Sequence, residues 1–320
     1  MFDTIGNPGI LGPLILAFLL MIPLCLALLA LLDCIKVRLV RTRRRWGLVR
    51  MALVSNALLA LCAVDAWLIE PGMLTVTRIT GSSPRIASGA SALKVIQVSD
   101  VHFVHRSVLS TKVLAAIEAE KPDLVFLTGD VYQPTGYSAP ELSDFLSALV
   151  HIAPVYAVTG FDDERVIRSA SHGQVHILDD SEETVLVRGT RIRIAGADSS
   201  GDAARLKPDP GSLVFLLMHS PDSLRVHMKP DLQPCADWAF AGHTHGGQVR
   251  LPFWGAVLTG CYSGKRYEYG QYKIGKANLF VTRGIGLEPK PAPQVRFCCR
   301  PEIVVLTLRR ESAAETRMAK

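Results

Sequence analysis

Two apolar stretches open the chain, before the pattern changes to short apolar runs separated by polar segments. Residues 10–32 carry no charge. As a helix at about 1.5 Å per residue, this stretch would be about 34 Å long, enough to cross a hydrocarbon core of about 30 Å. A second uncharged run, at 51–64, reaches Ile69 only by including Asp65. We therefore expect one membrane span, followed by either a second span or a helix lying in the membrane interface.

Beyond residue 72 the apolar runs become short and rich in β-branched residues, which is typical of buried strands. A strand is expected at 74–79, followed by a Ser/Gly/Ala-rich connector at 81–91. The next strands are predicted at 94–98, 124–127, 155–158, 191–195 and 213–218, with helices at 109–120 and 140–150. Later runs have no helices between them and favour a second, more antiparallel sheet; they lie at 249–251, 272–274, 279–282, 295–298 and 303–308. The expected fold class is α/β with two sheets.

Composition supports the membrane anchor. The 320 residues are 49% hydrophobic and 20% charged, with a mean hydropathy of +0.25, whereas an average soluble domain is about 25% charged. We expect four parts: a membrane anchor with one or two transmembrane helices and a basic loop at 1–72, a strand and connector at 73–91, one folded domain at 92–310, and a C-terminal tail at 311–320.

The positive charge lies almost entirely beside the apolar stretches. Residues 1–90 hold nine Lys/Arg and four Asp/Glu, a balance of +5 out of a total of +6. The remaining 230 residues are therefore nearly neutral, so nucleic acid is not an expected partner. The expected partners of the basic residues are anionic lipid headgroups. The basic loop at 36–45 is expected in the cytoplasm by the positive-inside rule. With two spans the folded domain would lie on the outer side of the membrane, and with one span it would lie on the cytoplasmic side.

Polar residues that can bind metals follow five of the apolar segments. Asp100 and His102 follow the strand at 94–98, and Asp130 follows the next strand. A third strand ends in Gly160-Phe161-Asp162-Asp163. His219 follows 213–218, and His243 and His245 stand in the stretch Gly-His-Thr-His-Gly-Gly-Gln after 239–241. Because the carboxyl ends of strands in open α/β sheets share one rim, these residues can converge there. Carboxylate and imidazole ligands without a thiolate suit Mn, Fe or Zn in a reactive rather than a structural site.

This order of motifs resembles the calcineurin-like metallophosphoesterases. The similarity runs from about residue 70 to 308 and is greatest to a membrane-associated bacterial branch, which includes phosphodiesterases and one class of UDP-2,3-diacylglucosamine hydrolase. It implies a four-layer αββα metallophosphoesterase sandwich with two divalent metal ions. By the family pattern Asp100, His102 and His245 would hold one ion, Asp130 would bridge, and His219 and His243 would hold the other. Asp130, His243 and Asp162 are then the candidate catalytic residues.

One block departs from the family pattern, which reads Gly-Asn-His-Asp/Glu at this point. Here Gly160 is followed by Phe161, which cannot bind a metal, and by Asp162, which cannot donate a proton when ionised. Two interpretations follow. The chain is either a phosphohydrolase acting on a phosphoanhydride or phosphodiester of an amphipathic substrate, such as a UDP-2,3-diacylglucosamine-like glycolipid, or a degenerate membrane-tethered binder of metal and phosphate. A phosphoanhydride suits the first interpretation, because a phosphate leaving group departs without protonation.

The resemblance and the charge pattern together place the protein in the bacterial inner membrane. We expect the catalytic domain on the outer face of that membrane, with the cytoplasmic face as the alternative. The phospholipid bilayer and an amphipathic phosphorylated substrate are the predicted partners, and no protein partner is predicted.

Overall fold

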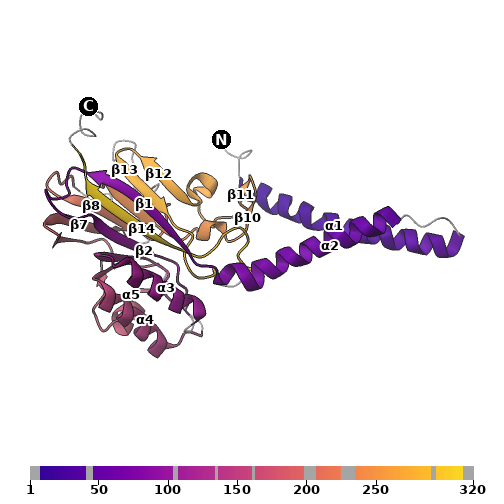
Figure 1. Ribbon diagram of the computed structural model, residues 1–320, viewed down its shortest axis with the longest axis horizontal. Helices are drawn as coiled ribbons and strands as arrows, with labels where there is room; N and C mark the ends of the chain where they lie inside the picture. Colours follow the sequence, from indigo (N-terminus) through magenta and orange to yellow (C-terminus); the bar gives the residue numbers. More distant parts are fainter. Residues whose placement is uncertain are drawn as a thin grey trace.

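The structure is a computed structural model that describes residues 8–40, 46–103, 107–133, 136–160, 163–197, 207–224, 235–289 and 293–312. Its first two helices, α1 (Pro8–Val40) and α2 (Trp46–Val64), run side by side as a hairpin that projects from the body (Figure 1). The amide of Asn56 on α2 donates to the carbonyl of Pro23 on α1 at 3.3 Å. The segments Leu19–Arg38 and Trp46–Gly72 are both long and apolar enough to cross a membrane. The two helices are therefore candidates for an anchor, while residues 41–45 of the basic loop lie outside the described residues.

Short helical turns at Asp65–Ile69 and Glu70–Gly72 join the hairpin to the body. The buried carboxylate of Glu70 accepts the backbone N–H of Cys298, at 2.8 Å, and that of Cys299. The N–H of Arg296 donates to the carbonyl of Ala66 at 3.0 Å. These hydrogen bonds join the turns after α2 to a loop of the body. The hairpin is therefore held to the body by hydrogen bonds as well as by the continuous chain.

The first sheet has six strands in the order β1 (Thr75–Ser83), β14 (Glu302–Arg310), β2 (Leu93–Val98), β3 (Leu124–Thr128), β4 (Val155–Val158) and β5 (His176–Ile177). The strand expected at 303–308 in a second sheet is thus misplaced. It lies between β1, to which it is parallel, and β2, to which it is antiparallel. Its run of buried Val, Ile and Leu fits this central place, where both faces of the strand are covered. The segment expected to connect the anchor to the body supplies the edge strand β1.

The second sheet also has six strands, in the order β12 (Gly270–Ile274), β13 (Ala277–Val281), β9 (Trp238–Ala241), β8 (Leu213–Met218), β7 (Thr190–Ala197) and β6 (Glu182–Val187). We expected a more antiparallel sheet, which is wrong for its centre. Strands β7, β8, β9 and β13 are parallel, and only the two edge pairs are antiparallel. The expectation rested on the absence of a recognisable helical pattern between these runs in the sequence, which does not determine strand direction. A two-stranded ribbon of β10 (Arg250–Leu251) and β11 (Gly255–Ala256) is separate.

The two sheets stack with their apolar faces together, which confirms the α/β class. Phe126 of the first sheet contacts Phe215 and Phe240 of the second, with ring centroids 5.3 and 5.5 Å apart. Helices α3 (Val108–Glu120), α4 (Ala139–Ile152) and α5 (Asp163–Ala170) cover the outer face of the first sheet (Figure 1). Within the described residues, the outer face of the second sheet is packed by turns and by the short helix Gly264–Tyr267 instead of a long α-helix.

Two further expectations need correction. The strand predicted at 295–298 is irregular, with one isolated bridge from Phe297 to Val249. Its Arg296 is fully buried and donates to backbone carbonyls, including that of Cys299 at 3.0 Å. Carbonyls around this segment therefore accept from the guanidinium instead of from a neighbouring strand. Helix α5 and the short strands β5 and β6 were not predicted, because their sequences have no long apolar period.

Candidate metal centre

The carboxyl ends of β2, β3, β8 and β9 meet at one edge of the stacked sheets. The loops that follow them bring together all six predicted ligand side chains in two groups of three. Within each group the potential ligand atoms lie within 4.8 Å of one another. The first group is Asp100, His102 and His245, and the second is Asp130, His219 and His243.

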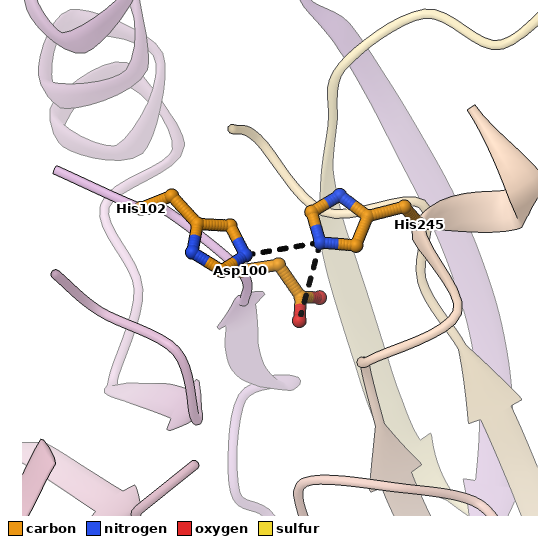
Figure 2. Close-up of side chains that lie close together, drawn as sticks. All are labelled: Asp100, His102 and His245. Carbon is orange, nitrogen blue, oxygen red and sulfur yellow. Dashed lines mark hydrogen bonds and ion pairs between the residues drawn. The ribbon is translucent and has the colours of Figure 1, made fainter. Parts of the chain in front are cut away.

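The first group is almost completely buried. The Nε2 atoms of His102 and His245 lie 3.1 Å apart, and their rings are stacked with centroids 5.0 Å apart (Figure 2). The Oδ1 atom of Asp100 lies 4.0 Å from Nε2 of His245. One nitrogen pair and one carboxylate oxygen therefore face a common point, as three ligands of a single ion would.

The second group is joined to the first by the carboxylate of Asp130. Its Oδ2 lies 3.4 Å from Nε2 of His219, in its own group, and 3.6 Å from Nε2 of His102, in the other. Nδ1 of His219 donates to the carbonyl of Thr128 at 3.0 Å, which directs Nε2 at Asp130. A hydrogen bond of this kind fixes the tautomer of a metal-binding histidine. The ring of His243 completes the group, with its centroid 4.9 Å from that of His219.

The backbone at this edge is unusually strained. Five of the six residues have φ between 43° and 67°, in the left-handed region; they are Asp100, His102, Asp130, His243 and His245. Non-glycine residues seldom adopt this conformation, and each instance costs on the order of 1–3 kcal/mol. Strain of this size persists only where the surrounding structure enforces it, and here it directs five side chains inward.

Glycine at position 160 is required by close packing against Asp130. A Cβ at this position would lie 1.9 Å from Oδ1 of Asp130 and 2.6 Å from its backbone nitrogen. The loop after β4 therefore presses directly on the carboxylate that joins the two groups.

Burial sets the charge state of the histidines. Desolvation lowers the pKa of His102 to about 4, and it also lowers the pKa values of His243 and His245. His219 differs: burial disfavours its charge, but the hydrogen bond and charge of Asp130 raise its pKa to about 10. Three imidazoles are thus held neutral, which is the form that binds a metal.

Asp100 is also perturbed by burial, which raises the pKa of its carboxyl to about 7. The N–H of His243 donates to Oδ1 of this carboxylate at 2.9 Å, while the buried Oδ2 has no hydrogen-bond partner among the residues that the structure describes. Unpaired buried polar atoms are costly. An acceptor left without a donor, beside neutral imidazoles with free nitrogens, fits a divalent cation, and the oxygen and nitrogen donor set suits Mn, Fe or Zn.

Sequence reasoning missed two acidic residues that the structure places here. Asp163 is fully buried, and its Oδ2 accepts the N–H groups of Val131, at 3.0 Å, and Gly160, at 3.1 Å. It ties the loop after β3 to the loop after β4, and burial raises its pKa to about 6. The sequence did offer a signal for Asp163, because it is the last residue of the third motif, Gly160-Phe161-Asp162-Asp163.

The second missed residue is Glu288, which lies in the loop after β13. Its Oε2 is 3.1 Å from Nε2 of His245, so it could act as a further oxygen ligand of the first group. Nothing in the sequence around Glu288 indicates this role. The predicted catalytic residue Asp162, like Phe161, lies outside the described residues.

Two stacked sheets with carboxylate and imidazole side chains gathered at one edge form the class of site that metal-dependent hydrolases use. Comparison with known proteins gives the family. A family model described as the calcineurin-like phosphoesterase superfamily domain matches residues 93–251. The chain is 31% identical to the uncharacterized metallophosphoesterase YkuE of Bacillus subtilis, over 75% of this chain and 87% of that protein. It is 34% identical to the phosphodiesterase YaeI of Escherichia coli, over 75% of this chain and 90% of that protein.

A more distant relative is the UDP-2,3-diacylglucosamine pyrophosphatase LpxG of Chlamydia trachomatis, which is 23% identical over 74% of this chain and 90% of that protein. The chain belongs to the calcineurin-like phosphoesterase superfamily. It is a metallophosphoesterase, a hydrolase of phosphoester bonds, as its motifs predicted.

Proposed function

We propose that this protein holds two divalent cations at the membrane surface and hydrolyses a phosphoester or phosphoanhydride bond of an amphipathic substrate. The observation that carries the proposal is the position of Asp130, whose Oδ2 lies within 3.6 Å of an imidazole nitrogen from each group. When bound, such a pair of ions lowers the pKa of water and neutralises charge on a phosphoryl group. The six described residues would supply carboxylates to offset metal charge and imidazoles to bind it.

The chain's own residues prepare the site in two ways. Asp100, His102 and His245 are almost completely buried, so their interactions with a phosphoryl oxygen or a cation are screened less than in water. Asp163 and Gly160 hold the loops that position Asp130, through two backbone hydrogen bonds and a close packing contact. The residues are thus oriented before a substrate arrives, which is the condition for electrostatic catalysis.

A phosphoanhydride is the substrate class we favour. Phe161 replaces the asparagine and Asp162 the histidine of the family motif, so the histidine that would assist an alkoxide leaving group is missing. A phosphate leaving group needs no such assistance. The relative LpxG is named a UDP-2,3-diacylglucosamine pyrophosphatase, and a nucleotide-linked glycolipid of that kind has both the anhydride and the lipid chains.

The anchor supports an amphipathic substrate, because it confines the enzyme to the bilayer surface. With two spans and the basic loop in the cytoplasm, the catalytic domain lies on the outer face of the bacterial inner membrane. A UDP-linked precursor is cytoplasmic, so either the second segment does not span the membrane, or the substrate is an external lipid or cell-wall phosphoester. Protease added to intact spheroplasts should digest the body in the two-span arrangement, and full protection would place it inside.

Activity is tested with the purified full chain, Mn²⁺ and bis(p-nitrophenyl) phosphate. Steady hydrolysis that is abolished in Asp130→Ala supports the proposal. Metal binding without turnover would instead identify a degenerate phosphate-binding protein. Comparing a pyrophosphate-linked lipid with an alkyl phosphodiester then tests the substrate class, and a clear preference for the diester would refute the phosphoanhydride.

A further inference from the structure

A pocket of about 470 Å³ joins the candidate metal centre to the membrane helix α1. Its lining includes Leu16, Ala17 and Leu20 of α1, together with His243 and His245. Volumes of about 300–1,000 Å³ are typical of sites for small ligands. One cavity therefore contacts both the residues proposed to bind metal and the residues proposed to enter the bilayer.

The side of the pocket that the body supplies has an apolar part, next to the polar residues Thr244, Gln248, Thr259 and Glu288. Val249, Val257 and Leu258, from the segment around the β10–β11 ribbon, line it with Pro293. Leu258 is 57% exposed although it is a large apolar residue. Exposed apolar surface beside a concave site marks a place where an apolar group binds. The pocket thus combines aliphatic walls with imidazoles at the reaction centre.

The α1 part of this pocket lies within the apolar stretch predicted to span the membrane. Leu16, Ala17 and Leu20 all fall inside the uncharged residues 10–32. In the same region of the body, the aromatic rings of Phe253 and Tyr262 are fully or almost fully exposed. Exposed aromatic residues of this kind are typical of the interface between water and lipid. The body therefore presents the mouth of its site to the bilayer.

From this arrangement we infer that the pocket binds the alkyl or acyl chain of a lipid phosphoester while its phosphoryl group lies at the six ligands. The inference rests on the proposed function and adds the subsite that recognises the lipid. The expected occupant is the chain of the substrate, because the same pocket contacts the reaction centre. A bilayer lipid that is not a substrate would not need to place its phosphoryl group beside the histidines.

The first test measures chain-length preference in full-length protein in nanodiscs with Mn²⁺. The substrates are p-nitrophenyl methyl phosphate and p-nitrophenyl hexyl phosphate. Moving a methylene from water into an apolar pocket contributes up to about fourfold in kcat/KM. We expect kcat/KM of the hexyl ester to exceed that of the methyl ester by at least about tenfold. No preference in the wild type would overturn the inference.

Variants on α1 locate the preference. Leu20→Trp places an indole in the pocket and should lower the ratio of hexyl to methyl kcat/KM about tenfold. Leu28→Trp is the matched control, because Leu28 is 55% exposed on the same helix and is not part of the pocket lining. Its ratio should stay at the wild-type value. An unchanged ratio in Leu20→Trp, or an equal fall in both variants, would contradict the subsite.

A second measurement needs no turnover. A hexylphosphonate with a diazirine at the end of its chain should crosslink to residues 16–20 and 249–258, and unlabelled hexylphosphonate should compete. Crosslinks elsewhere, or crosslinks that hexylphosphonate does not reduce, would overturn the inference. Crosslinking at these residues without hydrolysis of either ester or of a pyrophosphate-linked lipid would refute the proposed function while leaving the subsite supported, so the two failures are distinguishable.

Discussion

The carboxylate of Asp130 provides the sharpest test of the two-ion proposal. In Asp130→Asn the side chain keeps its size and one acceptor oxygen but loses its charge. Oδ2 lies 3.4 Å from Nε2 of His219 and 3.6 Å from Nε2 of His102. Ligand atoms bound to one ion at about 2.1 Å are about 3.0–3.4 Å apart, so this oxygen is placed to contact an ion in either group.

The magnitude follows from the charge that is removed. Two unit charges 4 Å apart at an effective dielectric constant of about 20 interact by about 4 kcal/mol. Since about 1.4 kcal/mol corresponds to a factor of ten, the loss is about a thousandfold in metal affinity. The same factor should appear in kcat/KM at a fixed, limiting metal concentration, because both ions are needed.

The assay titrates the metal-free full chain with Mn²⁺, by calorimetry, and measures hydrolysis of bis(p-nitrophenyl) phosphate in the same samples. Asp144→Asn is the matched control, because Asp144 is exposed on α4, away from the site, and should behave as wild type. If Asp130→Asn bound two Mn²⁺ with affinity within tenfold of wild type and kept its turnover, Asp130 would not join the two groups, and the mechanism would be wrong.

Three other variants probe the residues around this carboxylate. Gly160→Ala puts a Cβ 1.9 Å from Oδ1 of Asp130, so activity should fall at least a hundredfold while circular dichroism stays native; full activity would contradict the packing argument. Glu288→Gln should weaken Mn²⁺ binding about 10–100-fold if its carboxylate, 3.1 Å from Nε2 of His245, is a ligand, and an unchanged isotherm would exclude that role. Asp163 has a pKa raised from 3.8 to about 6, so its favourable contribution to metal-free stability is present below pH 3.8 and lost as pH rises through 6, a change of about 3 kcal/mol. Urea unfolding at pH 4 and pH 7 should show this loss of unfolding free energy in the wild type and not in Asp163→Asn, whose amide oxygen can still accept both backbone N–H groups. An equal loss in the two proteins would refute the prediction.

The sequence predicted the residues of the candidate site more accurately than it predicted the order of the strands in the sheets. The six ligand candidates could be found because each follows a buried strand, and parallel strands bring their carboxyl ends to one edge. The strands that pair with 303–308 could not be predicted, because the apolar run at 303–308 would suit any buried strand. Only tertiary packing decides that it lies between β1 and β2.

Loops limited the prediction of the site in a different way. Glu288 stands in an irregular segment whose path depends on many distant contacts, including the bond from its N–H to the side chain of Gln248 at 2.8 Å. The segment at 295–298 has the alternation of a strand, yet it is bent around the buried guanidinium of Arg296, which also donates to the carbonyls of Arg283 and Gly284. Such bonds between distant segments leave no periodic signal in the chain.

The insertion of β14 beside β1 also constrains how the protein is made. β1 begins eleven residues after α2 ends, but it pairs with β14, and β14 pairs with β2. The edge strand β1 is therefore joined to the rest of the first sheet only once residues 302–310 exist. During synthesis the apolar hairpin leaves the ribosome more than two hundred residues earlier and can enter the lipid at once. The body must therefore complete its first sheet while already tethered, and a chain truncated before residue 302 would expose two unpaired strand edges at the membrane, where they invite aggregation.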